Sequence, residues 1–271
     1  MTLPLRTLTG LALAVAIALV ARRARSLAPS GAWGAIAVGT AATSAGWGWC
    51  GVLLAFFFSS TLLSRWRRER KERVTRAIVD KGGERDAWQV MANGGVFTLC
   101  ALGAIVAPSP LWAVAGVGTL AAATADTWAT EIGTALGGVP RSIVGWRPVP
   151  IGTSGAVTVA GTVAMCAGAL CIGTVARATG FDQGVMWPAV VGGIGGAMAD
   201  TWLGATLQER RWCGHCREAT ERRLHDCGRE TARRSGWAGL DNDVVNLTSC
   251  VVGGAAALLW RVVVARAASK A

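Results

Sequence analysis

The 271-residue chain has the length of one or two soluble domains, but 52% of its residues are hydrophobic and only 16% are charged. Soluble globular domains carry about 25% charged residues, so the composition excludes that class. The net charge of +11 sits in a few blocks between long apolar stretches, which argues against a soluble protein that binds nucleic acid. The pattern predicts an all-α, polytopic membrane helix bundle.

A membrane-spanning helix needs about 20 predominantly apolar residues. Eight stretches come close to this length, and we expect spans at 3–21, 31–45, 48–64, 87–107, 111–136, 153–176, 185–207 and 244–264. The second and third are the shortest, so one re-entrant pair and seven spanning helices are the alternative. The first resembles a signal peptide, but Arg22, Arg23 and Arg25 do not suit a cleavage site, which favours a retained helix.

Basic residues divide unequally between the two sides of this topology. Four connections on one side hold 22 of the 27 Lys and Arg residues. The positive-inside rule therefore places these connections in the cytoplasm and both termini outside, in a multi-pass protein of the plasma membrane. Arg261, Arg266 and Lys270 near the C-terminus conflict with this orientation.

Two regions follow from the same pattern. Residues 1–80 hold the N-terminal transmembrane helices and a basic cytoplasmic loop. Residues 81–271 hold the spans that carry motifs, together with a cytoplasmic Cys/His loop at 209–243. Ala-Asp-Thr-Trp occurs twice, and its aspartates are 74 residues apart on spans of the same direction, which hints at an internal duplication. Close helix packing by the surrounding small residues is the alternative explanation.

Charged residues inside spans are costly and are candidates for function. Asp126 and Glu131 lie in the fifth span, and Asp200 lies in the seventh. Further polar residues stand at the cytoplasmic ends of neighbouring spans, and these are Arg85, Gln89, Asn93, Gln208, Asn242 and Asn246. Because all these groups fall in the same half of the membrane, we expect one shared site. The alternative is that polar groups at helix ends only reach the interface by snorkelling.

The chemistry of such a site can be narrowed. Three carboxylates favour a bound cation, and hard oxygen ligands suit Mg²⁺, which typically bridges to phosphates. Gly152, Thr153, Ser154 and Gly155 open the sixth span, where the free N–H groups of a helix N-terminus attract phosphate, although a plain helix cap is the alternative. Lys81 and Arg85 can balance negative charge. This combination matches the requirements of phosphoryl transfer.

Three cysteines and one histidine gather in the loop before the eighth span. Cys213 and Cys216 form a Cys-x-x-Cys pair, and His225 and Cys227 follow as His-x-Cys. Such a set can fill a tetrahedral Zn²⁺ site, and disulfides are disfavoured in the cytoplasm. A structural zinc that folds this polar loop is one interpretation, and free thiols are the other.

Several of these segments together resemble a known family. The motifs are Arg-Asp-x-x-Gln-Val-x-Ala-Asn-Gly-Gly at 85–95, Ala-Asp-Thr-Trp-Ala-Thr-Glu-Ile-Gly at 125–133, Gly-Thr-Ser-Gly-Ala-Val-Thr at 152–158, Asp-Thr-Trp-Leu-Gly-Ala-Thr-Leu-Gln at 200–208, Cys-x-x-Cys with His-x-Cys-Gly at 213–228, and Asn-Asp-x-Val-Asn at 242–246. In this order they resemble the transmembrane protein 19 family (DUF92), which includes phytyl-phosphate kinases.

The resemblance implies Mg²⁺-dependent phosphoryl transfer from a nucleoside triphosphate, with CTP as a candidate, to an isoprenoid monophosphate such as phytyl or geranylgeranyl phosphate. Asp126, Glu131 and Asp200 would hold the metal. The other expected site residues are Arg85, Asn93, Asn242 and Asn246 as catalytic groups, and Lys81, Gln89, Gly152, Thr153, Ser154, Gly155 and Gln208 as substrate contacts. A transporter or flippase of a phosphorylated lipid is the alternative, and it would place its polar groups near the midplane. A structural bundle would leave Asp126 and Asp200 far apart.

Overall fold

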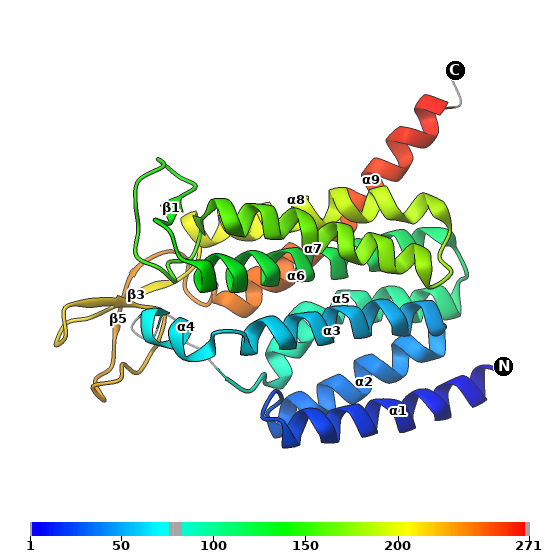
Figure 1. The fold of residues 1–271 in the computed structure, drawn as a ribbon, viewed down its shortest axis with the longest axis horizontal. Coiled ribbons are helices and arrows are strands. Elements are labelled where there is room, and N and C mark those ends of the chain that lie inside the picture. The colour runs from blue at the N-terminus through cyan, green and yellow to red at the C-terminus, as the bar shows by residue number, and fades with distance from the viewer. Residues whose placement is uncertain (1, 76–77, 79–82, 269–271) are drawn as a thin grey trace.

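The computed structural model describes residues 2–75, 78 and 83–268. Within these residues, long helices run back and forth in one bundle (Figure 1). They are α1 (Leu3–Arg23), α2 (Pro29–Ala45), α3 (Trp47–Arg65), α5 (Ala87–Val106), α6 (Pro110–Leu136), α7 (Val159–Ala178), α8 (Met186–Thr206) and α9 (Asn242–Ala268). A short helix, α4 (Arg68–Thr75), follows α3, and one 3-10 turn, η1 (Gln183–Val185), precedes α8. The expected all-α membrane bundle is confirmed.

In the described part of the chain, two small β-sheets lie at one end of the bundle. β1 (Arg141–Ser142) pairs antiparallel with β2 (Ala156–Val157), so that Arg141 lies opposite Val157. In the connection before α9, a three-stranded antiparallel sheet has the order β4-β3-β5. Its strands are β3 (Arg210–Cys213), β4 (Glu218–Thr220) and β5 (Ala232–Ser235). The sequence predicted only a loop here.

Local signals explain where several helices begin. At α5, Gln89 N–H donates to Asp86 Oδ1 at 2.9 Å and Asp86 N–H donates to Gln89 Oε1 at 3.1 Å, which forms a capping box. Thr158 Oγ1 caps α7 by accepting from Gly161 N–H at 3.0 Å. The expected start of this span at residue 153 is therefore wrong. Gly152 and Gly155 have φ of +89° and +77°, which a right-handed helix cannot contain.

The described helices differ in how apolar they are. Five of them, α1, α3, α5, α7 and α9, are long and apolar enough to cross a membrane by length and composition. The remaining long helices, α2, α6 and α8, match the other expected spans. α2 and α3 are separate helices of 17 and 19 residues. At 1.5 Å per residue each is roughly 26–29 Å long, which is close to the thickness of the hydrocarbon core of a bilayer.

Helix α6 is the centre of the bundle. Every residue from 114 to 125 is buried, and the helix packs against α3, α5, α7, α8 and α9. Most residues of this segment are Ala, Gly, Val or Thr, which allow neighbouring helices to approach closely. The core around α6 fixes the relative positions of α6 and α8, which carry the two Ala-Asp-Thr-Trp motifs.

The close contact between α8 and α6 depends on the absence of a side chain at Gly196. A Cβ on Gly196 would lie 2.4 Å from Ala122 Cβ and 2.7 Å from the Ser249 carbonyl oxygen, whereas a Cβ on the adjacent Gly195 would meet Ala256 at an ordinary 3.5 Å. We expect Gly196→Ala to destabilise the fold by about 1–3 kcal/mol, the usual cost of overpacking. Gly195→Ala is the matched control and should leave stability unchanged or raise it. Thermal unfolding in detergent compares them, and equal stability would contradict the packing described.

One end of the bundle collects the basic connections. The described connecting segments 24–28, 83–86, 137–158 and 207–241 all lie there with α4 and the β-strands, while α1 begins and α9 ends toward the opposite end (Figure 1). These are the connections that hold most of the Lys and Arg residues. The arrangement of helices agrees with the alternation predicted from the sequence.

Candidate functional site

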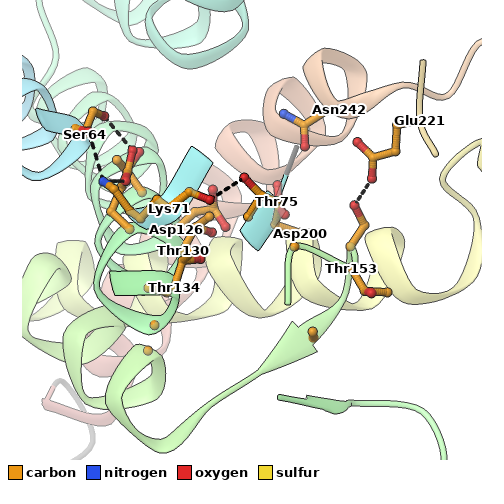
Figure 2. A pocket seen from close by; sticks show the side chains of 18 of the residues that line it. Ser64, Lys71, Thr75, Asp126, Thr130, Thr134, Thr153, Asp200, Glu221 and Asn242 are labelled. Atoms are coloured by element: carbon orange, nitrogen blue, oxygen red, sulfur yellow. Dashed lines mark hydrogen bonds and ion pairs between the residues drawn. The ribbon is translucent and has the colours of Figure 1, made fainter. Parts of the chain in front are cut away.

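A cavity of about 720 Å³ lies at this basic end of the bundle (Figure 2). The ends of α3, α5, α6, α7 and α8 and the start of α9 line it, together with α4, the 151–158 segment and parts of the 208–241 connection. It brings together many of the predicted site residues: Arg85, Gln89, Asp126, Glu131, Gly152, Thr153, Ser154, Gly155, Asp200, Gln208 and Asn242. These residues, which the sequence predicts as parts of one polar site, therefore line one cavity.

Asp126 and Asp200 meet inside the cavity. They come from α6 and α8, both line the cavity, and their side chains are close enough to interact with each other. The Oδ2 atom of Asp200 is buried and has no hydrogen-bond partner among the described residues. Two adjacent carboxylates repel each other unless a cation or a shared proton lies between them. The pair is therefore the part of the cavity best suited to hold a divalent cation.

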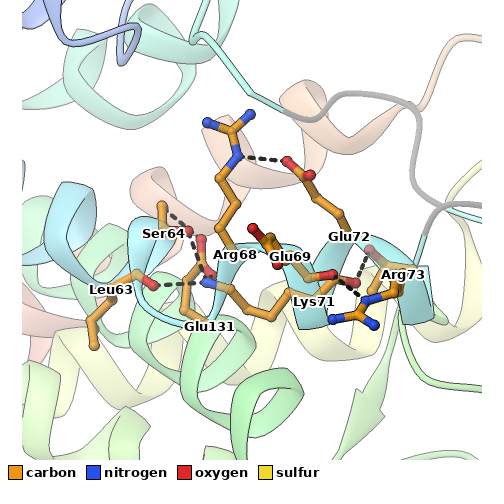
Figure 3. Close-up of polar contacts among 9 residues, drawn as sticks. Leu63, Ser64, Arg68, Glu69, Lys71, Glu72, Arg73 and Glu131 are labelled. Atoms are coloured by element: carbon orange, nitrogen blue, oxygen red, sulfur yellow. Dashed lines mark hydrogen bonds and ion pairs between the residues drawn. The ribbon is translucent and has the colours of Figure 1, made fainter.

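Glu131 has a different setting, one helical turn or more farther along α6. Its carboxylate forms an ion pair with Lys71 of α4 and accepts a hydrogen bond from Ser64 Oγ at 2.6 Å (Figure 3). Lys71 is buried and also donates to the carbonyl oxygens of Leu63 at 2.7 Å and Ser64 at 3.0 Å. Lys71 is not recognisable as a site residue from the sequence, because it stands in a run of charged residues that resembles a solvated loop.

Arg85 reaches the same corner of the cavity. Its guanidinium donates to Ser64 Oγ at 3.2 Å and to Thr61 Oγ1 at 3.3 Å. Burial lowers the pKa of Arg85, and the neighbouring Glu131 carboxylate opposes this shift. An arginine side chain remains charged in either case. Arg85 is therefore a fixed positive charge close to Glu131 and Lys71.

The glycine-rich segment lines the cavity as a turn and not as a helix N-terminus. Ser154 Oγ donates to the Glu221 carboxylate, and the Ser154 carbonyl oxygen accepts from Arg210 at 3.1 Å. A Cβ on Gly155 would lie 2.3 Å from the Ala205 backbone nitrogen, so the turn packs tightly on the end of α8. The segment therefore lines the cavity as a turn that precedes α7, and the N-terminus of this helix begins only at Val159.

The predicted amide residues separate into two groups. Gln89, Gln208 and Asn242 line the cavity, and Gln208 is only 3% exposed. Asn93 and Asn246 do not belong to the lining residues. Asn93 instead donates to the Gln89 carbonyl oxygen at 3.0 Å, within its own helix. The remaining predicted substrate contact, Lys81, lies outside the described residues.

The cavity wall contains further residues that the sequence analysis did not single out. Thr127, Thr130 and Thr134 line it along one face of α6. Basic groups from several elements add positive charge, namely Arg65, Arg68, Arg211 and Arg223. Glu209 accepts from Gly239 N–H at 2.7 Å, and this bond lowers the pKa of Glu209. No sequence signal separates these arginines from the others, because their positions depend on how the connections fold.

The four Cys and His residues of the last connection form one cluster. The ligand atoms of Cys213, Cys216, His225 and Cys227 all lie within 4.8 Å of one another. The Cys216 backbone N–H, which donates to Cys213 Sγ, lowers the pKa of Cys213, whereas hydrogen bonding with Cys227 raises the pKa of Cys216 to about 12. The described thiols are free and not joined in disulfides. The cluster has the composition of a Cys₃His metal site.

Comparison with known proteins decides the family. The chain matches the model of the integral membrane protein family DUF92 over residues 12–254. The chain belongs to this family. The resemblance inferred from the motifs is thereby confirmed, and the DUF92 protein is an integral, multi-pass membrane protein.

Relatives of this DUF92 chain occur in archaea, plants and cyanobacteria. An uncharacterized membrane protein from Methanocaldococcus jannaschii is 35% identical over 162 residues, which cover 59% of this chain and 65% of that protein, just under two thirds of its length. Protein PGR from Arabidopsis thaliana is 28% identical over 264 residues, covering 87% and 89%. An uncharacterized membrane protein from Synechocystis sp. is 30% identical over 219 residues, covering 78% and 74%. No solved structure matches the chain.

Proposed function

We propose that this DUF92 protein is a Mg²⁺-dependent phosphotransferase of the plasma membrane. Its acceptor is an isoprenoid monophosphate such as phytyl or geranylgeranyl phosphate, and its donor is a nucleoside triphosphate, with CTP as the first candidate. The cavity faces the cytoplasm in this proposal. The observation that carries it is the meeting of Asp126 and Asp200 inside a cavity that basic side chains surround.

The donor set supports a hard cation. Asp126 and Asp200 would hold Mg²⁺, because their carboxyl groups meet and Asp200 Oδ2 has no hydrogen-bond partner among the described residues. Glu131 is occupied by Lys71 and Ser64 in this arrangement, so its role is to hold Lys71 at the cavity wall. When bound, Mg²⁺ would neutralise part of the charge of the phosphates.

The other residues of the cavity suit phosphates and a lipid. Arg85 and Arg223 place positive charge in the wall of the same cavity and would orient the donor and acceptor phosphates. Met165 and Met198 provide an apolar part of the wall that would contact the isoprenoid chain. An acceptor phosphate oxygen attacks the γ-phosphorus and the bond to the β-phosphate oxygen breaks, so a diphosphate and a nucleoside diphosphate form. The acceptor is already ionised, so no general base is required.

The position of the cavity favours transfer over transport. A transporter needs polar groups near the midplane and a path to both sides. The described lining residues instead gather where the basic connections leave the bundle, the side on which a soluble nucleotide and a membrane lipid can meet. The close contact of Asp126 and Asp200 likewise argues against a bundle whose polar helix ends only pack.

An assay with a matrix of substrates tests the proposal. The purified protein in lipid nanodiscs is incubated with phytyl, geranylgeranyl or farnesyl phosphate, with each of CTP, ATP, GTP and UTP, with and without Mg²⁺. We expect a prenyl diphosphate, detected by mass spectrometry, that depends on Mg²⁺ and on one preferred nucleotide. If folded protein produces no diphosphate with any pair, the proposal is wrong. Movement of unchanged prenyl phosphate across liposomes would identify transport instead.

A further inference from the structure

The connection between α8 and α9 folds although it has little apolar material. Its three short strands, β3, β4 and β5, place Cys213 and His225 among its few buried residues, at 0% and 7% exposure. The segment 209–241 is rich in arginine and glutamate. A unit this small rarely supports itself with a hydrophobic core, and a bound metal commonly replaces one.

The four side chains have the spacing of a tetrahedral site. Cys213 Sγ lies 3.7 Å from Cys227 Sγ, and His225 Nδ1 lies 3.3 Å from Cys227 Sγ. Sulfur ligands at about 2.3 Å from a shared zinc ion are roughly 3.8 Å apart at tetrahedral angles. A disulfide does not explain the cluster, because its sulfur atoms would lie about 2.05 Å apart.

Neighbouring backbone and side-chain groups also orient the ligand residues. The backbone N–H of Cys216 donates to Cys213 Sγ at 3.5 Å, which suits a thiolate held in the turn between β3 and β4. On the far side of the imidazole ring, His225 Nε2 lies 3.6 Å from the Glu218 carboxylate. A carboxylate behind the second ring nitrogen is a common partner of a histidine that binds a metal through the first nitrogen.

The same loop supplies part of the cavity wall. Between Cys216 and His225, Glu221 accepts a hydrogen bond from Ser154 Oγ, and its backbone N–H donates to the Ile78 carbonyl oxygen at 2.9 Å. Thr231 Oγ1 donates to the Arg223 carbonyl oxygen at 3.0 Å, and this bond links the segment around Arg223 to the residue that directly precedes β5. Glu221 and Arg223 both line the cavity. The segment that carries Glu221 and Arg223 therefore lies between two of the four ligand residues, Cys216 and His225.

We propose that Cys213, Cys216, His225 and Cys227 bind one zinc ion, and that this ion holds Glu221 and Arg223 in the wall of the cavity. The ion is structural, because all four of its positions are filled by protein ligands. This proposal goes beyond the phosphotransferase activity and does not depend on it.

Metal analysis tests the site. The full-length protein is purified in detergent without chelator, and its zinc is measured by mass spectrometry. We expect about one zinc per chain, with a loss of tenfold or more in Cys216→Ser and Cys227→Ser; Cys166→Ser, at an exposed cysteine of α7, is the matched control. Protein stripped of metal and titrated with Co²⁺ should show the absorption of tetrahedral thiolate coordination. Wild-type protein that contains no zinc and takes up no Co²⁺, or serine variants that retain zinc, would overturn the site.

Proteolysis tests the link to the cavity wall. The arginines of the loop, including Arg222 and Arg223, are potential trypsin sites. We expect chelation to raise the rate of tryptic cleavage within 209–241 at least tenfold, and added zinc to restore protection. Unchanged cleavage after zinc has been removed would show that the ion does not order this wall. Neither result uses phosphoryl transfer, so failure of the zinc proposal and failure of the phosphotransferase proposal are distinguishable.

Discussion

Asp200→Asn and Asp126→Asn are each expected to lower the rate of prenyl diphosphate formation by about 100-fold or more, because either change removes negative charge where the cation is expected to bind. Asparagine keeps the size and hydrogen-bonding capacity of aspartate, so the fold should persist. The two carboxylates act as a unit, and the double variant should be little worse than either single variant. Rates at saturating nucleotide and increasing Mg²⁺ measure the effect.

Thermal unfolding supplies a second readout of the same variants. In the absence of Mg²⁺, removing one of two facing carboxylates relieves repulsion, so each variant should be as stable as the wild type or more stable. Added Mg²⁺ should raise the unfolding temperature of the wild type and have little effect on the variants. Asp182→Asn is the control, since Asp182 lies at the opposite end of the bundle, before α8. Full activity in Asp200→Asn would refute the assignment of the metal site.

Lys71→Met is expected to destabilise the protein by about 3 kcal/mol, because the Glu131 carboxylate would lose its cation partner in a largely buried position. The side chains of Lys71 and Glu131 are only 9% and 21% exposed. Replacing both partners in Lys71→Met/Glu131→Leu should recover most of the loss, since well-packed apolar groups often substitute for a buried ion pair. A double-mutant cycle on the unfolding free energy isolates the pairwise contribution.

A second ion pair of α4 provides the control for this cycle. Arg68 and Glu72 are one helical turn apart, and their side chains are 50% and 56% exposed. Solvent screens such a pair, so Glu72→Gln should leave the unfolding free energy nearly unchanged. A similar loss in Glu72→Gln and in Lys71→Met would mean that α4 responds to any change of charge, and that the pair with Glu131 has no special role.

The bundle was largely predictable because its apolar runs are long and are separated by charged connections. The meeting of Asp126 and Asp200 followed from the alternation of the spans and from their equivalent motifs. Asn93 and Asn246 show where such reasoning stops. Each lies four residues deeper in its helix than the cavity-lining residues Gln89 and Asn242, which is about 6 Å farther along the axis. The sequence thus predicts at which end of the helices the polar residues lie, but it does not predict how far along each helix the cavity extends.

Other parts of the site depended on tertiary structure. Lys71 could not be separated from the other basic residues of 65–75, because it becomes buried only when α4 packs against α6 and the Lys71 ammonium bonds to the end of α3. The start of α7 was misjudged because small residues at 152–158 continue the apolar run, while the backbone at Gly152 and Gly155 requires a turn. The Cys/His quartet was visible from its spacing alone, but its link to the cavity through Glu221 and Ser154 was not.

Among the described long helices, those that fall short of the length or hydropathy of a candidate membrane span alternate with those that reach both. α2, α6 and α8 each stand in the chain between two helices that are long and apolar enough to cross a membrane. During synthesis, a helix that carries carboxylates or many glycines partitions poorly into lipid by itself. Each of these helices has a strongly apolar neighbour on both sides, with which it can enter the bilayer as a helical hairpin. The order of helices thus provides a route by which acidic residues reach the interior of the bundle during biosynthesis without any single segment having to carry them into lipid alone.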